Sequence, residues 1–191
     1  NTNIAICYKD LKISYKDLFE KVNKHTKAIN KCTHNRNVGI YFHNSINYAI
    51  GYFAVTFCNN VIIPLEDTIN KETIRSIIAY CEISLILTDS ENYDSLIHMI
   101  CDFEHKIEVY NVDTETITSI GKEKQIVQGD EDENDVVIML HTSGTTNAPK
   151  RVMLTNKNLI ANIESNIQSL KITEDDVCLI VLPMFFGYCN S

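Results

Sequence analysis

A chain of 191 residues is long enough for one domain with a sizeable core. Its composition, 45% hydrophobic and 22% charged, is ordinary for a soluble globular protein. The net charge of −8 argues against broad nucleic-acid binding or binding to anionic membranes, because an acidic surface is repelled by both. No apolar run approaches the roughly 20 residues that a membrane span requires, and residues 1–12 alternate polar and apolar side chains unlike a signal peptide.

Seven cysteines are scattered along the chain without a Cys-x-x-Cys pair. An odd number without metal-like spacing predicts reduced thiols and a cytoplasmic protein. The chain begins with Asn1 and ends at Ser191, soon after an apolar stretch, so we expect a piece of a longer protein. The cysteines are Cys7, Cys32, Cys58, Cys81, Cys101, Cys178 and Cys189.

Short β-rich runs alternate with helical patterns along the first two thirds of the chain. Single helices between strands are typical of βαβ units, so the sequence predicts an α/β fold with a largely parallel sheet and helices on both faces. The helix 46–57 is apolar nearly all round and is expected to be buried. Strands are predicted at 38–42, 61–65, 85–88 and 107–110, and helices after the caps Ser14, Asn44 or Ser45, and Asn70, and at 93–101.

The second part of the chain begins with a weak pattern over 111–128 and an acidic run over 129–135. We interpret the acidic run as a solvated loop, because its spacing does not match an EF-hand and metal binding has little other support. A strand is predicted at 136–142, a short β-like run at 152–154, and a helix after the cap Thr155. The apolar run 177–182 is predicted to be another buried strand.

The segment 142–150 follows the apolar strand directly and reads Thr-Ser-Gly-Thr-Thr-Asn-Ala-Pro-Lys. Hydroxylated residues and glycine let a backbone fold tightly around an anion with N–H and O–H donors pointing inward, and a lysine adds a mobile positive charge. The order of a Walker phosphate loop is absent, so a P-loop NTPase fits poorly. A Ser/Thr-rich turn between two strands is the simpler alternative.

This segment, continued through residues 152–159, resembles the phosphate-loop signature of the adenylate-forming superfamily, which includes acyl-CoA synthetases, adenylation domains of non-ribosomal peptide synthetases, and luciferases. The family pattern is Thr-Ser-Gly-Thr-Thr-Gly-x-Pro-Lys-Gly-Val. Three further segments are similar to family elements in the same order, so the resemblance covers essentially the whole chain. They are residues 13–18, 57–65 and 182–186.

Four positions depart from the family pattern. Asn147 and Arg151 stand where the family has glycine, Asn156 replaces a histidine, and Cys189 replaces a glycine. Asn tolerates positive φ, whereas Arg151 would be strained there. Arg151 either contacts phosphate or is a solvent-facing strand residue. These departures from the family pattern raise the question of whether the intact protein is catalytically active.

The resemblance implies a site for ATP and Mg²⁺. It assigns Lys150 a catalytic role as mobile charge on the β- and γ-phosphates, and it assigns no metal ligand. Phe186 either lines the region where the acyl substrate and adenine meet or belongs to the core. The residues that cradle the phosphates are Thr142, Ser143, Gly144, Thr145, Thr146 and Lys150.

The implied function is that of the N-terminal portion of an AMP-forming acid–thiol ligase, with 1–191 as the N-terminal subdomain region of the large AMP-binding domain. The partners would be a carboxylic acid, CoA or the phosphopantetheine thiol of an acyl or peptidyl carrier protein, and missing C-terminal parts of the same protein. The family's later elements do not occur before Ser191, so this piece is expected to be inactive by itself. The alternative is a truncated or degenerate nucleotide-binding or scaffold module.

Overall fold

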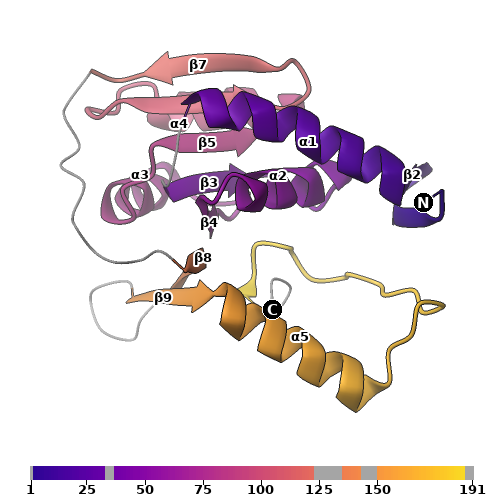
Figure 1. The fold of residues 1–191 in the computed structure, drawn as a ribbon. Coiled ribbons are helices and arrows are strands. Elements are labelled where there is room, and N and C mark those ends of the chain that lie inside the picture. Colours follow the sequence, from indigo (N-terminus) through magenta and orange to yellow (C-terminus); the bar gives the residue numbers. More distant parts are fainter. Residues whose placement is uncertain (1, 33–36, 123–134, 143–149, 188–191) are drawn as a thin grey trace.

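The computed structural model describes residues 2–32, 37–122, 135–142 and 150–187 (Figure 1). Most of the acidic run 129–135 and the residues Ser143, Gly144, Thr145, Thr146, Asn147 and Cys189 therefore lie outside the described residues, as do the side chains of Thr142 and Lys150.

A seven-stranded sheet forms the centre of the fold, in the order β7-β6-β5-β3-β4-β8-β9. The five inner strands are parallel, and the edge strands β7 and β9 pair antiparallel to their neighbours. This confirms the predicted α/β class with a largely parallel sheet. The strands are β3 (Asn37–Tyr41), β4 (Val61–Pro64), β5 (Leu85–Thr88), β6 (Ile107–Asn111), β7 (Thr116–Ile120), β8 (Val136–Thr142) and β9 (Lys150–Thr155).

Helices cover both faces of the parallel strands, and each face has its own apolar cluster. One cluster joins β3 and β5 to the helices α1 (Tyr15–Cys32) and α2 (Ile46–Phe57). The other joins the sheet to α3 (Lys71–Tyr80) and α4 (Ser90–Ile100). Because both faces are covered, the strands β3 to β6 are buried at nearly every position rather than at every second one.

The helix starts follow the predicted caps. The Ser14 hydroxyl accepts a hydrogen bond from the Asp17 backbone N–H, and the Asp17 carboxylate accepts one from the Ser14 N–H, which completes a capping box. At α2 the choice between Asn44 and Ser45 is settled, because the Ser45 hydroxyl accepts from the Tyr48 N–H. Asn70 and Thr155 cap α3 and α5 as predicted.

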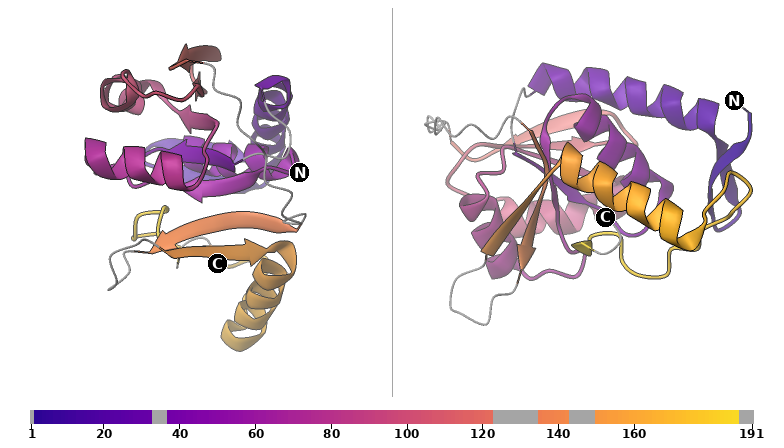
Figure 2. Two further views of the ribbon diagram at one scale, coloured as in Figure 1. Left: turned by 90° about the vertical axis from the view of Figure 1, so that its left-hand side faces the viewer. Right: turned by 60° about the horizontal axis from the view of Figure 1, so that its bottom comes forward.

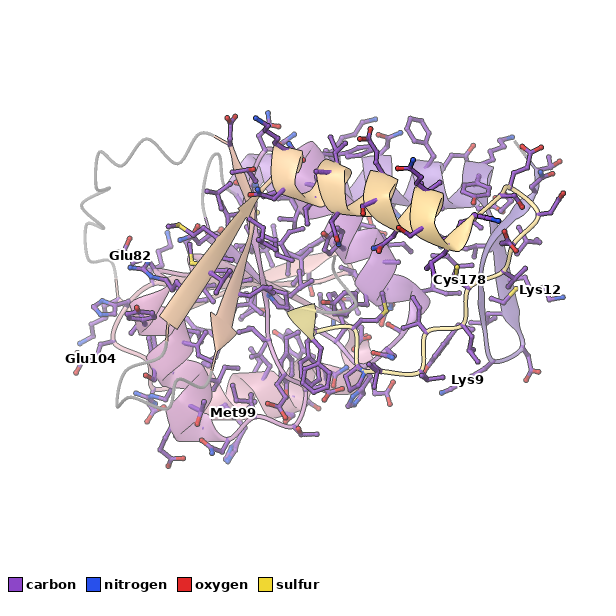
Figure 3. The ribbon with its side chains drawn as sticks, turned by 90° about the horizontal axis from the view of Figure 1, so that it is seen from below. Lys9, Lys12, Glu82, Met99, Glu104 and Cys178 are labelled. Carbon is purple, nitrogen blue, oxygen red and sulfur yellow. The ribbon has the colours of Figure 1, made fainter. Side chains whose placement is uncertain are left out.

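Helix α5 (Asn156–Leu170) lies beyond β9, at the end of the molecule opposite β7 (Figures 1 and 2). The chain after it runs past Cys178 and returns to the sheet, as Figure 3 shows from below. Of the side chains in α5, all of which the structure describes, none is buried.

The predicted buried strand at 177–182 is wrong. These residues form no strand pairing within the described chain, and Val177 and Leu179 are 94% and 85% exposed. An apolar run becomes a strand only when another strand supplies hydrogen-bond partners, and no described strand pairs with this one.

Other differences concern edges and surfaces. The weak pattern after residue 110 contains β7, and the start of the chain forms an unpredicted hairpin of β1 (Ile4–Tyr8) and β2 (Leu11–Ser14). Helix α4 begins at Ser90, earlier than expected, because Asp89 caps it. Helix α2 is not buried all round, since Phe53 and Phe57 are exposed.

One polar pair is buried between α1 and the sheet. His25 Nδ1 lies 2.9 Å from the Tyr110 hydroxyl oxygen, and His25 is 6% exposed. Burial lowers the pKa of His25 below its ordinary value and raises the pKa of Tyr110 to about 12. Both groups are therefore neutral near pH 7, which lets them pair without an unmatched buried charge.

Candidate functional site

The hairpin β8–β9 carries the segment singled out in the sequence. The strands run antiparallel, and the last pair in the register is Thr142 opposite Lys150. Partners in such a pair have Cα atoms about 4.5–5.5 Å apart, so the two ends of the segment 142–150 meet. The structure thus brings the backbones of these two predicted site residues together.

The hairpin is anchored on the central sheet by its first strand. Ile138 of β8 pairs with Ile62 of β4, and the neighbouring Val137 and Met139 are also buried. Apolar side chains on both sides of a strand hold it between two packed layers. The end of β8, from which residues 143–149 follow, is therefore attached to a fixed scaffold.

Arg151 contacts the helical layer. Its guanidinium lies over the Tyr80 ring of α3, 4.5 Å from the ring centroid, which is a cation–π arrangement. This contact favours the strand interpretation of Arg151 over a phosphate contact.

Residues 182–187, which we call the strap, join the start of α2 to β8. The Asn44 side chain donates from Nδ2 to the Leu182 carbonyl at 2.9 Å and accepts at Oδ1 from the Met184 N–H at 2.7 Å. The Tyr48 hydroxyl donates to the Met184 carbonyl at 2.9 Å. Three hydrogen bonds thus fix the first half of the strap.

The second half of the strap contacts β8. A Cβ added to Gly187 would lie 2.7 Å from Cδ1 of Leu140, so the glycine allows a close approach there. Leu140 precedes Thr142 by two residues, or about 7 Å of strand. The strap therefore passes beside the strand that ends at the predicted phosphate segment.

Phe186 lies in the strap and is 47% exposed, so it is not a core residue here. Its ring centroid is 4.6 Å from that of Phe185 at an interplanar angle of 56°, and its N–H donates to the Pro183 carbonyl. Exposure leaves the ring accessible to a ligand, but its predicted role in lining a substrate site stays a prediction.

Sequence reasoning missed Asn44 and Tyr48 as residues of this region. Asn44 was considered as a helix cap, and its strap partners are distant in the sequence. Sequence reasoning also missed the contact between His43 Nδ1 and Asp67 Oδ2, which lie 2.6 Å apart. The Tyr41 hydroxyl donates a hydrogen bond to the backbone carbonyl of the same Asp67. No short motif signals contacts of this kind.

Two of the described thiols, those of Cys58 and Cys81, are buried. All six described cysteines are free, and burial raises the pKa of Cys58 and of Cys81 to about 11. Because a thiolate is the nucleophilic form, these two thiols are inert near neutral pH.

The profile of the family described as AMP-binding enzyme matches residues 2–190. The chain therefore belongs to that family, and its fold is that of the N-terminal domain of adenylate-forming enzymes.

The similar proteins include a gramicidin synthase and a CoA ligase. It is 30% identical to gramicidin S synthase 1 of Brevibacillus brevis over 182 residues, covering 91% of this chain and 16% of that protein. It is 28% identical to oxalate–CoA ligase of Arabidopsis thaliana over 160 residues, covering 78% and 30%. The chain thus spans less than a third of either relative.

Solved structures show the same fold at lower identity. Apo MatB from Rhodopseudomonas palustris superposes with a TM-score of 0.76 at 20% identity, over 99% of this chain and 39% of that one. O-succinylbenzoate coenzyme A synthetase from Bacillus subtilis, in complex with AMP, superposes with a TM-score of 0.73 at 22% identity, over 95% of this chain and 46% of that one.

Within the part of the chain described, no helix is both long and apolar enough to cross a membrane.

Proposed function

We propose that the chain is the N-terminal portion of an acid–thiol ligase that uses ATP to convert a carboxylic acid to an acyl-adenylate for transfer to CoA or a carrier-protein thiol. The observation that carries the proposal is the pairing of Thr142 with Lys150, which brings the two ends of the segment 142–150 together on a hairpin anchored in the sheet. Family membership supports the adenylate-forming class, and the two types of relative leave the acceptor open.

In this proposal the segment 142–150 holds the β- and γ-phosphates of ATP. Backbone N–H groups and the hydroxyls of Thr142, Ser143, Thr145 and Thr146 would donate to phosphate oxygens, with Gly144 allowing close approach. The carboxylate of the substrate would attack the α-phosphate, and Lys150 would stabilise the charge that develops on the departing pyrophosphate.

Mg²⁺ is the metal expected with ATP. Among the described residues, no group of three or more His, Cys, Asp and Glu side chains is placed to hold a metal ion. We therefore assign no described residue to Mg²⁺ and derive no step through it.

We further propose that the 191 residues are inactive by themselves and that the remaining parts of the intact protein complete the site. The chain covers 39% of the apo MatB chain, so most of a comparable enzyme lies outside it. The exposed apolar side chains of α5 and of residues 177–182 are surfaces that further polypeptide would cover.

The test is ATP–pyrophosphate exchange by the intact protein with a panel of carboxylic acids, for wild type and Lys150→Ala. Loss of a charge-assisted contact of about 1.5–3 kcal/mol should lower kcat/KM for ATP about 10- to 150-fold. Lys157→Ala is the matched control, because Lys157 is an exposed lysine in the first turn of α5.

Two results of the exchange assay would contradict parts of the proposal. Unchanged kinetics in Lys150→Ala would remove the role of Lys150. If the wild type exchanges pyrophosphate with no acid, the alternative of a non-catalytic nucleotide-binding or scaffold module is favoured. The departures from the family pattern at Asn147, Arg151 and Cys189 are the reason for considering that alternative.

A further inference from the structure

Asn44 has an unusual position for a residue next to a helix start. Ser45 already caps α2, so the Asn44 amide is not used for capping. Instead both of its polar ends bind the backbone of the strap, one as donor to Leu182 and one as acceptor from Met184. An amide that satisfies a C=O and an N–H two residues apart fixes their orientation as well as their distance.

On its N-terminal side the strap follows an exposed segment of the chain. The six residues before Pro183 are all exposed and form no strand pairing within the described chain. The Asn44 side chain makes two hydrogen bonds to its backbone, the Tyr48 hydroxyl makes a third, and Met184 packs against the apolar cluster beside α1 and α2. Two of these contacts come from the Asn44 side chain, so its removal should loosen the strap.

Phe186 lies between two fixed points. Met184 is held at the start of α2, and Gly187 lies against Leu140 of β8, the strand that leads to Thr142. A shift of Met184 would thus move the Phe186 ring relative to the end of β8.

We propose that Asn44 is a positioning residue that holds the strap so that Phe186 forms a wall of the carboxylic-acid site beside the end of β8. The proposal rests on the proposed function for the identity of the ligand. It extends that function by assigning acid recognition to a residue distant in sequence from both Phe186 and the segment 142–150.

The kinetic test uses the intact protein with Asn44→Ala and pyrophosphate exchange. We expect the KM for the acid to rise on the order of tenfold, as for the loss of a pair of neutral hydrogen bonds, while the KM for ATP changes less than about twofold. Asn47→Ala is the matched control, because Asn47 is in the first turn of α2 and donates to Asp113 at 3.0 Å instead of to the strap.

A double-mutant cycle tests whether Asn44 acts through Phe186. If it does, Asn44→Ala in a Phe186→Ala background should raise the KM for the acid by less than about twofold, because the ring that it positions is gone. Equal changes in the two backgrounds would overturn the proposal, as would equal rises in KM for acid and ATP or a loss of thermal stability with unchanged KM.

Hydrogen exchange separates this proposal from the proposed function. In the intact protein, Asn44→Ala should speed amide exchange in a peptide spanning 182–187 about tenfold, and Asn47→Ala should leave it unchanged. This holds whether or not any acid is activated. Unchanged exchange in Asn44→Ala would overturn the positioning role even in an active enzyme, whereas faster exchange in an inactive protein would leave the strap contact standing and reject only the acid ligase.

Discussion

The strands β3 to β6 and the chain after β9 both contain many apolar residues, but they bury them very differently. Ile40, Ile62 and Leu87 in the parallel strands are fully buried. In α5, Ile163 and Ile167 are 49% and 45% exposed, and Val177 beyond it is 94% exposed. Apolar patterning therefore shows which surface of an element can be buried, whereas burial itself requires a partner layer.

The largest effect should come from truncating an equivalent side chain in the two regions. Ile62→Ala removes a fully buried side chain from a central strand and should cost about 2–5 kcal/mol of unfolding free energy. Ile163→Ala on α5 should cost less than about 0.5 kcal/mol in this chain. Urea unfolding followed by circular dichroism measures both. If both variants lost a similar amount of unfolding free energy, α5 would be buried in solution and the contrast between the two regions would be wrong.

Two glycines test packing density in the same regions. A Cβ at Gly39 would lie 2.9 Å from Leu65 and 3.3 Å from Ile86, both fully buried, so Gly39→Ala should cost about 1–3 kcal/mol. At Gly187 the contact is the tip of the half-buried Leu140 side chain, which can rotate away. Gly187→Ala should therefore cost less than about 1 kcal/mol by the same measurement. The reverse order would place the tighter packing at the strap.

The smallest effect concerns pH. Burial lowers the pKa of His25 below 6.5, with a smaller contribution from Lys24, so the unfolded chain takes up a proton at higher pH than the folded chain. The full stability is present above about pH 6.5 and is lost as the pH falls from there towards the lowered pKa. His25→Gln, which keeps a hydrogen-bonding group near Tyr110, should flatten this slope.

Urea unfolding between about pH 7.5 and pH 5.5 measures that slope. His98→Gln is the control for the loss of a histidine, because His98 lies on the exposed side of α4. An equally steep slope in His25→Gln would show that other groups carry the pH dependence.

Local patterns predicted the inner elements well because each signal was complete within a few residues. The range 46–57 was predicted for α2 and observed without change, and its cap Ser45 was one of two candidates. Strand β7 was missed because Thr116–Ile120 is an edge strand with a mostly polar sequence. The run 177–182 was predicted to be a strand because apolar residues are typical of buried strands, and periodicity cannot show that a partner is absent.

In the candidate site, too, one part was predicted from a local pattern and another part was seen only in the structure. The order of residues in 142–150 predicted a phosphate-binding segment, and the structure adds that its two ends, Thr142 and Lys150, pair. The link between Asn44 and the strap has no sequence signal, because two backbone groups accept and donate the bonds and backbone groups are the same in every residue.

The pairing of Ile62 with Ile138 also has a consequence for folding kinetics. The hairpin β8–β9 can form from near neighbours, whereas its docking on β4 must close a loop that contains α3, α4 and three other strands. Contacts of such long range form slowly. The βαβ units should therefore assemble first, and the hairpin β8–β9 should dock on the sheet as one of the last steps.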